Sequence, residues 1–435
     1  MNEDLKYKIM LPGGWAIVSF AESCDKISLN GIKIKQKQYL TEGKYPVVDQ
    51  GQALIGGYFD DEKLIVPGKP PYVIFGDHTR VKKYINFRFI AGADGVKVLK
   101  PFAFLNEKLF FYFLHCIKLP DKGYARHLQF LEKTDIPLPP LSEQHRIVAK
   151  IEELFSSLDK GIESLKTAQQ QLKIYRQAVL KWAFEGKLSN KNIVEGELPD
   201  GWQNKKINEL GRVETGTTPS KKNPNFYSDE YPFYKPTDLN AGNNVVSSTD
   251  GLSELGIKEA RFVPASSTLV TCIGATIGKT GFIKKGGGFN QQINAIIPSK
   301  EHNPKFIYYQ AVSPDFQKQI QNNASATTLP ILNKGKFENL TMVCCLPEEQ
   351  QTIVAEIESR LSVCDKIEES IEHSLKQAEA LRQSILKKAF EGKLVPQDPN
   401  DEPASVLLAR IKAERESNKA ETLRHRQTKK KKVHS

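Results

Sequence analysis

The six residues AFEGKL at Ala183–Leu188 return unchanged at Ala389–Leu394. The match extends well upstream of these letters. Aligned without a gap, Gln144–Leu188 and Gln350–Leu394 are identical at about half of their positions. A match of this length is an internal repeat, and it indicates that the chain is built from a duplicated unit.

Both copies of the repeat have the pattern of a long helix. Apolar residues recur mostly at steps of three and four, as they do along a coiled-coil seam, while Glu, Lys and Gln fill the other positions. Prolines precede each copy, and a glycine, Gly186 or Gly392, marks each end. The expected seam consists of Ile147, Ile151, Leu154, Leu158, Ile162, Leu165, Leu172, Tyr175, Val179 and Ala183, and of Ile353, Ile357, Leu361, Cys364, Ile367, Ile371, Ala378, Leu381, Ile385 and Ala389.

Two copies of one helix pair most economically about a local two-fold axis, so we expect them to pair antiparallel. Some 40 helical residues span roughly 60 Å, which suits a spacer better than a core element. The alternative is that each helix packs only on its own domain. That alternative does not explain why the same seam occurs twice.

A block of unrelated sequence precedes each helix, and the two blocks share only their edges. LPGGW (Leu11–Trp15) and LPDGW (Leu198–Trp202) open the blocks, and FLEKTDIPLPP and FENLTMVCCLP close them. Short β-type runs and turn residues fill both blocks. We therefore expect an α+β protein in which two mixed α/β domains are separated by two long helices that form an antiparallel coiled coil, with pseudo-two-fold internal duplication. The expected bounds are 1–140 and 191–346 for the two domains, 141–190 and 347–395 for the helical regions, and 396–435 for a C-terminal segment with a basic tail.

The composition is that of an ordinary globular protein. The chain has 435 residues, of which 39% are hydrophobic and 26% charged. We find no apolar run of membrane-spanning length and no signal-peptide pattern. The six cysteines show no CxxC spacing, so we expect no metal or disulfide framework, reduced thiols and a cytoplasmic location.

The net charge of +11 favours an acidic partner. Part of the excess lies in the tail RHRQTKKKKVHS. Nucleic acid is the leading specific partner, because a basic face gains affinity from phosphate contacts and counterion release. The alternative is a basic surface that merely keeps the protein soluble.

Three catalytic signatures can be tested, and all three fail. In GATIGKT (Gly274–Thr280) only three residues separate the first glycine from Gly-Lys-Thr, whereas a phosphate-binding loop needs four, and the following GFIKKGGGFN reads as a hairpin. KPPY (Lys69–Tyr72) and NPNF (Asn223–Phe226) only partly match the amino-methyltransferase signature and follow no glycine-rich turn. The histidines, His78 included, have neither metal-ligand spacing nor a nucleophile beside them. We expect no catalytic residue and no metal site in this chain.

Polar and basic loops with glycines remain, and they suit DNA. Lysines and short hydroxyls bind phosphates, and Asn and Gln amides read base edges. The candidates for DNA contact are Lys33, Lys35, Gln36, Lys37, Gln50, Gln52, Asp77, His78, Thr79, Arg80, Arg126 and His127 in the first block, and Thr217, Thr218, Ser220, Lys221, Lys222, Lys235, Thr237, Asp238, Thr276, Lys279, Asn290, Gln291 and Gln292 in the second.

Nearly end to end, the chain resembles the specificity (S) subunits of type I restriction-modification systems. The resemblance rests on LPDGW, GTTPSKKNP, PFYKPTDL, GATIGKTGF, NQQINAI and PLPPLSEQHRIVAKIEELF, and on the duplicated AFEGKL with the following VPQDPNDEPASVLLARIKAER. The first block departs from the pattern: GTTPSKKNP has no equivalent there, and GDHTRVKKYINF stands where GATIGKT is expected.

The resemblance implies a non-catalytic DNA-recognition subunit. Two target recognition domains each read half of an interrupted sequence in double-stranded DNA. The helices fix the gap and, with Pro403–Glu416, dock two methyltransferase (M) subunits; restriction (R) subunits complete the hetero-oligomer. S-adenosylmethionine, ATP and Mg would be bound by the partners and not by this chain. Two alternatives remain: a specificity subunit of a type IIB-like or fused restriction-methylation enzyme, and a coiled-coil scaffold unrelated to DNA.

Overall fold

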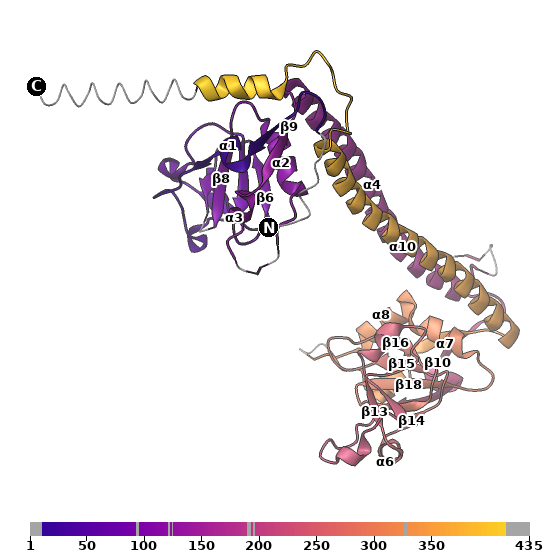
Figure 1. Cartoon of the computed structure of the whole chain (residues 1–435). Helices are drawn as coiled ribbons and strands as arrows, with labels where there is room; N and C mark the ends of the chain where they lie inside the picture. Colours follow the sequence, from indigo (N-terminus) through magenta and orange to yellow (C-terminus); the bar gives the residue numbers. More distant parts are fainter. Residues whose placement is uncertain are drawn as a thin grey trace, which may run out of the picture. The chain divides into compact units, whose positions relative to one another are not determined.

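The computed structural model describes residues 11–92, 95–120, 122–123, 125–188, 193–194, 196–325 and 329–414. The chain divides into two compact units: Met1–Ser164 with Ser374–Ser435, and Leu165–His373 (Figure 1). The C-terminal basic tail lies outside the described residues. In the described part of the chain, no helix is both long enough and apolar enough to cross a membrane.

The described residues of the first unit form three sheets. The four-stranded sheet has the order β2-β8-β5-β6 with antiparallel neighbours, the three-stranded sheet has the order β4-β3-β7, and β1 pairs with β9. Its elements before the first long helix are β1 (Ala16–Ser19), α1 (Phe20–Ser23), β2 (Cys24–Ile27), η2 (Gln36–Gln38), β3 (Tyr45–Val48), β4 (Gly57–Phe59), η3 (Glu62–Leu64), β5 (Tyr72–Gly76), β6 (Lys82–Ile85), β7 (Ile90–Ala91), β8 (Val96–Pro101), α2 (Glu107–Cys116), α3 (Leu128–Leu131) and β9 (Asp135–Leu138).

The second unit repeats this topology. Its sheets have the orders β11-β18-β15-β16 and β13-β12-β17-β14, and β10 pairs with β19. Its elements are β10 (Gln203–Lys206), α5 (Ile207–Leu210), β11 (Gly211–Thr215), η4 (Pro224–Phe226), β12 (Tyr231–Tyr234), η5 (Asp238–Ala241), β13 (Asp250–Leu252), α6 (Glu254–Glu259), β14 (Phe262–Val263), β15 (Thr268–Thr271), β16 (Thr280–Phe282), β17 (Gly287–Phe289), β18 (Ile293–Pro298), α7 (Pro304–Ala311), α8 (Pro314–Asn323), α9 (Lys334–Phe337) and β19 (Thr341–Cys344).

The shared topology places the dissimilar blocks in correspondence. The β5–β6 turn with GDHTR takes the place of the β15–β16 turn with GATIGKT, as the sequence indicated. Residues 28–35, between β2 and η2, take the place of GTTPSKKNP between β11 and η4. The first block therefore has a positional equivalent of GTTPSKKNP, although the two sequences differ. Each fold is an α+β domain, as expected.

The two repeats form α4 (Leu141–Phe184) and α10 (Pro347–Phe390), each of 44 residues. In the first unit the start of α4 packs with the end of α10: Arg382 pairs with Asp159 and lies 4.8 Å from the centre of the Phe155 ring. In the second unit the end of α4 meets the start of α10, where Arg176 pairs with Asp365 at 2.7 Å and with Glu368 at 2.9 Å.

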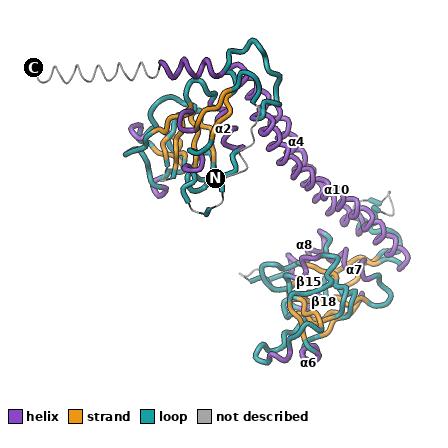
Figure 2. Tube along the Cα trace, in the orientation of Figure 1, coloured by secondary structure: helices purple, strands orange, loops and turns teal. Residues whose placement is uncertain are grey.

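Within each unit, opposite ends of the two helices are paired, so α4 and α10 are antiparallel, and they lie side by side in both views (Figures 1 and 2). The expected seam is partly wrong. Most of its residues are buried or half-buried, but Tyr175, Ile367 and Leu381 are 38%, 44% and 50% exposed.

The C-terminal segment belongs to the first unit. Residues 404–414 form a helix whose Ala404 and Leu407 are buried in the core of that unit. Asp401 pairs with Arg146 at 2.6 Å, and Lys412 pairs with Glu22 at 2.9 Å. The apolar face of this helix is therefore covered by its own domain, so only its outer face is left for the docking role expected of Pro403–Glu416.

Candidate nucleic-acid interface

In the first unit, several candidate residues gather at one edge of the four-stranded sheet. Gly76 at the end of β5 pairs with Val96 at the start of β8, and β6 begins just after the turn. The turn holds His78, Thr79 and Arg80. We call this end of the sheet, with the loops that meet there, the first loop edge.

Gln50 joins the first loop edge from the three-stranded sheet. The Thr79 hydroxyl donates to the Gln50 carbonyl at 2.7 Å, and the His78 N–H donates to the Gln50 side-chain oxygen at 3.3 Å. Lys33 also reaches the three-stranded sheet, because it forms a bridge to Ala91 at the end of β7. The candidates Lys35, Gln36 and Lys37 follow in the same segment. The four residues of this segment are exposed.

A buried carboxylate shapes the turn. Asp77 accepts a hydrogen bond from the Leu128 N–H at 2.9 Å and lies 3.4 Å from the Lys97 ammonium. His127 is fully buried, with its Nδ1 3.0 Å from the Asp77 carbonyl oxygen. In this position His127 supports the turn, whereas its neighbour Arg126 is exposed. Asp77 is also buried and supports the turn in the same way.

The second unit has a corresponding edge, which we call the second loop edge. Here β11 and β15 end and β16 and β18 begin. The Thr218 hydroxyl donates to the side-chain oxygen of Gln291, and Thr217 accepts a hydrogen bond from the Arg261 N–H at 2.9 Å. Asn290 is only 8% exposed, and its amide bonds to Gln292 at 3.1 Å. Asn290 thus shapes the loop that presents Gln291 and Gln292.

Lys235, Thr237 and Asp238 follow β12, next to Asn290, because β12 and β17 run parallel and end together. Lys235 pairs with Asp250, and Asp238 accepts hydrogen bonds from the Lys235 N–H at 2.7 Å and from Thr249 at 3.0 Å. Lys235 and Asp238 therefore stabilise the loop to which they belong, and Thr237 is exposed. The remaining candidates Ser220, Lys221, Lys222 and Thr276 are exposed, and Lys279 is half-buried.

The GATIGKT segment is a turn between two strands. Gly274 and Gly278 have φ of 101° and 87°, which glycine adopts without strain. Strand β16 follows at once, whereas a phosphate-binding loop leads into a helix. The expected hairpin after it is wrong, because β16 and β17 belong to different sheets.

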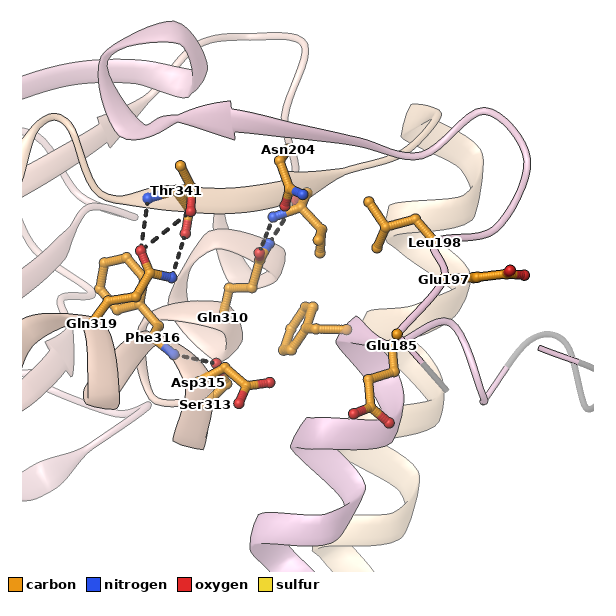
Figure 3. A pocket seen from close by; sticks show the side chains of 13 residues that line it. Glu185, Glu197, Leu198, Asn204, Gln310, Ser313, Asp315, Phe316, Gln319 and Thr341 are labelled. Carbon is orange, nitrogen blue, oxygen red and sulfur yellow. Dashed lines mark hydrogen bonds between the residues drawn. The ribbon is translucent and has the colours of Figure 1, made fainter. Parts of the chain in front are cut away.

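A cavity of about 240 Å³ lies in the second unit. Figure 3 shows Gln310 and Gln319 at its wall, and their amides bond to the backbone of Val343 and Thr341 at 2.5–3.0 Å. Glu185, Glu197 and Asp315 are its acidic residues, and among the described residues no histidine, cysteine or lysine lines it. Among the described residues, no group of histidine, cysteine and carboxylate side chains could hold a metal ion.

The chain thus has two α+β domains of one topology, each with a polar loop edge, and two long paired helices. The family model described as "Type I restriction modification DNA specificity domain" matches residues 12–173 and 199–377. The chain therefore belongs to this family and is a type I restriction-modification specificity subunit with two target recognition domains.

Curated relatives agree with this assignment. The chain is 36% identical over 149 residues to the HindI specificity subunit of Haemophilus influenzae, a match that covers 34% of this chain and 32% of that protein. It is 25% identical over 443 residues to the EcoDI specificity subunit of Escherichia coli, covering 93% of this chain and 96% of that one.

Solved structures share the fold. A chain from a type I R-M system, studied for complex assembly and conformational transition, has a TM-score of 0.67 at 19% identity and covers 88% of this chain and 99% of its own length. The HsdS subunit from Thermoanaerobacter tengcongensis has a TM-score of 0.54 at 19% identity, covering 88% of this chain and 98% of that one.

Proposed function

We propose that this chain binds an interrupted target in double-stranded DNA, with one target recognition domain for each half-site. The observation that supports this most directly is the duplicated polar edge. Two domains of the same topology present different side chains at corresponding loops, so each domain is suited to a different base sequence. The proposed domain bounds remain 1–140 and 191–346, and the candidate residues at both loop edges, other than the buried Asp77, His127 and Asn290, are the proposed contacts.

The division of labour at each edge follows from the side chains. Exposed lysines and hydroxyls, such as Lys37, Lys221 and Ser220, suit phosphate contacts that place the domain without reading sequence. Gln52 and Gln291 are exposed amides of the kind that read adenine. Half-sites on one face of the duplex would lie about one helical turn apart, roughly 34–36 Å.

We further propose that the long helices dock two methyltransferase subunits, and that restriction subunits join this complex in the cytoplasm. The helices carry exposed apolar side chains that their own partner helix does not cover. In the second unit these are Ile174, Tyr175, Trp182, Val363 and Ile367, with exposed fractions of 66%, 38%, 39%, 55% and 44%. Among them the Tyr175 and Trp182 rings lie 6.4 Å apart, and adjoining exposed apolar side chains are typical of protein interfaces. S-adenosylmethionine, ATP and Mg would then be bound by the partner subunits.

The test is a reconstitution. The chain and its M subunit are purified separately and together, and binding to duplex DNA and methyl transfer are measured. The proposal expects sequence-specific methylation only from the complex. Methylation of the same sites by the M subunit without this chain would contradict it. Specific methylation that requires a single large fused enzyme would favour the type IIB-like alternative.

A further inference from the structure

A loop in the first unit is closed around the side chain of a buried lysine. The loop Asp49–Gly56 connects β3 to β4, and its ends are joined by a hydrogen bond from the Gly56 N–H to the Val47 carbonyl at 2.8 Å. At its start the Asp49 carboxylate accepts a hydrogen bond from the Gly51 N–H at 2.8 Å.

Lys83 on β6 supplies the charge at the centre of this loop. Its side chain is 3% exposed, and its ammonium donates to the carbonyls of Asp49 at 2.8 Å and Ala53 at 2.5 Å. The Asp49 carboxylate lies 3.6 Å away. An ammonium has three donors, and a lysine is almost never buried without such partners. The lysine therefore fixes the shape of this loop from inside.

Gln50 fixes the position of the same loop against the first loop edge. Besides its bonds to His78 and Thr79, its side chain lies against Gly95, where an added Cβ would come within 2.6 Å of the amide oxygen. A side chain at Gly95 would push Gln50 out of place. The loop is thus held at two points, by Lys83 beneath it and by Gln50 beside the turn.

The tip of the loop is exposed and has side chains suited to bases. Gln52 is exposed, and Leu54 is 51% exposed although it is a large apolar residue. A single exposed leucine is common on protein surfaces. Here, however, the leucine is at the tip of a loop that a buried cation holds in shape, next to a glutamine. A glutamine amide pairs with adenine N6 and N7, and an apolar side chain contacts the thymine methyl group.

We propose that Asp49–Gly56 is a base-reading loop of the first target recognition domain, that Gln52 and Leu54 read A·T pairs, and that Lys83 is a positioning residue that never contacts DNA. This inference rests on the proposed function. It adds two residues, Leu54 and Lys83, that the sequence patterns did not identify as candidates.

The experiment maps methylated sites for complexes of this chain with its M subunit, on a randomised DNA library. The first half-site is identified as the one that changes when residues 12–139 are exchanged. Gln52→Ala and Leu54→Ala should each relax discrimination by about 10-fold or more at one or two A·T positions of that half-site, and leave the second half-site unchanged. Ile17→Ala is the control, because Ile17 is 60% exposed on β1, outside the loop.

Lys83→Met should relax the same positions and speed hydrogen exchange in Asp49–Gly56. Its matched control is Lys100→Met on β8, because Lys100 also donates to a carbonyl, that of Pro71 at 2.9 Å, and to a carboxylate, that of Glu107 at 3.0 Å. The control should lose stability without changing either half-site.

Two results would overturn the inference. Unchanged discrimination in both Gln52→Ala and Leu54→Ala would show that the loop does not read bases. If Lys83→Met lowered methylation equally on all sequences and, like Lys100→Met, changed neither half-site, Lys83 would be only a structural residue. Failure of the proposed function is a separate result, because the unmodified complex would then methylate without any sequence preference.

Discussion

Gln144 and Gln350 occupy the same position in the two copies of the repeat and make the same contact. The side-chain oxygen of Gln144 accepts a hydrogen bond from the Asn106 N–H at 2.7 Å, and that of Gln350 accepts one from the Asn303 N–H at 2.9 Å. Both glutamines are fully buried. Each recognition domain is therefore joined to its long helix by the same bond, although the domain sequences differ.

Replacing either glutamine should destabilise one domain and leave the stability of the other unchanged. Gln144→Leu leaves the Asn106 N–H and the carbonyls of Phe104 and Pro139 without their partner. We therefore expect the free energy of unfolding of the first unit to fall by about 2–3 kcal/mol. Gln350→Leu should do the same in the second unit. Hydrogen exchange measured domain by domain checks this, with the exposed Gln170→Leu as control. If one substitution speeded hydrogen exchange equally in both domains, the two glutamine contacts would not act separately.

Acid should destabilise the first unit through His115. Burial, aided by nearby Lys82, lowers the pKa of His115 to about 4, and its Nε2 has no hydrogen-bond partner among the described residues. The unfolded chain takes up this proton near pH 6.5, before the folded state does. Stability is therefore complete above pH 6.5 and should fall towards pH 4, by at most about 3 kcal/mol.

The measurement is urea unfolding from pH 7 to pH 4 for the natural chain and for His115→Leu, which cannot take up the proton. The variant should show a smaller decline over this window. Parallel curves for the two proteins would mean that His115 is not the group responsible.

The chain alone should be inactive. The chain belongs to a family of DNA specificity domains, and its GATIGKT turn leads into a strand instead of a helix, so we expect no methyl transfer, DNA cleavage or ATP hydrolysis. Assays of the purified chain with S-adenosylmethionine, DNA, ATP and Mg test this. Methyl transfer that co-purifies with the chain and survives removal of every partner would refute it.

Lengthening a long helix should lengthen the gap between half-sites. The stretch Thr167–Lys173 is polar, mid-helix and free of glycine and proline, and most of it is exposed. Four inserted helical residues add about 6 Å and nearly one turn, so the apolar seam returns to almost the same face. The added length corresponds to roughly one to two base pairs.

Methylation mapping of the insertion variant gives both the gap and the half-sites. We expect a longer gap with both half-site sequences kept. An unchanged gap in an active variant would mean that the helices do not set the spacing, and altered half-sites would mean that recognition itself was disturbed.

The sequence was sufficient for the architecture because the repeat is long and periodic. The helix bounds at Leu141 and Pro347 follow directly from proline punctuation and apolar spacing. The predicted seam was wrong at Tyr175, Ile367 and Leu381, which are exposed. Periodicity identifies an apolar face but does not show which of its residues another surface covers. An amphipathic face serves a partner helix and an external partner equally well.

The loop edges were only partly predictable. Candidates chosen by residue type included His127 and Asn290, which are buried and hold loops in shape. Lys83 was missed because a lysine in a strand reads as solvated, and its acceptors are backbone carbonyls that sequence does not display. The place of GDHTR was predicted, but the equivalence of residues 28–35 to GTTPSKKNP appeared only from strand order, since those two sequences share no pattern.

If each domain reads its own half-site independently, exchanging one domain should change only one half of the target. Residues 12–139 are replaced by the corresponding block of another family member, the chimera is combined with the M subunit, and methylated sites are mapped. We expect one half of the target to change to that of the donor, while the other half and the gap are kept. A change in both halves, or in neither, would contradict it.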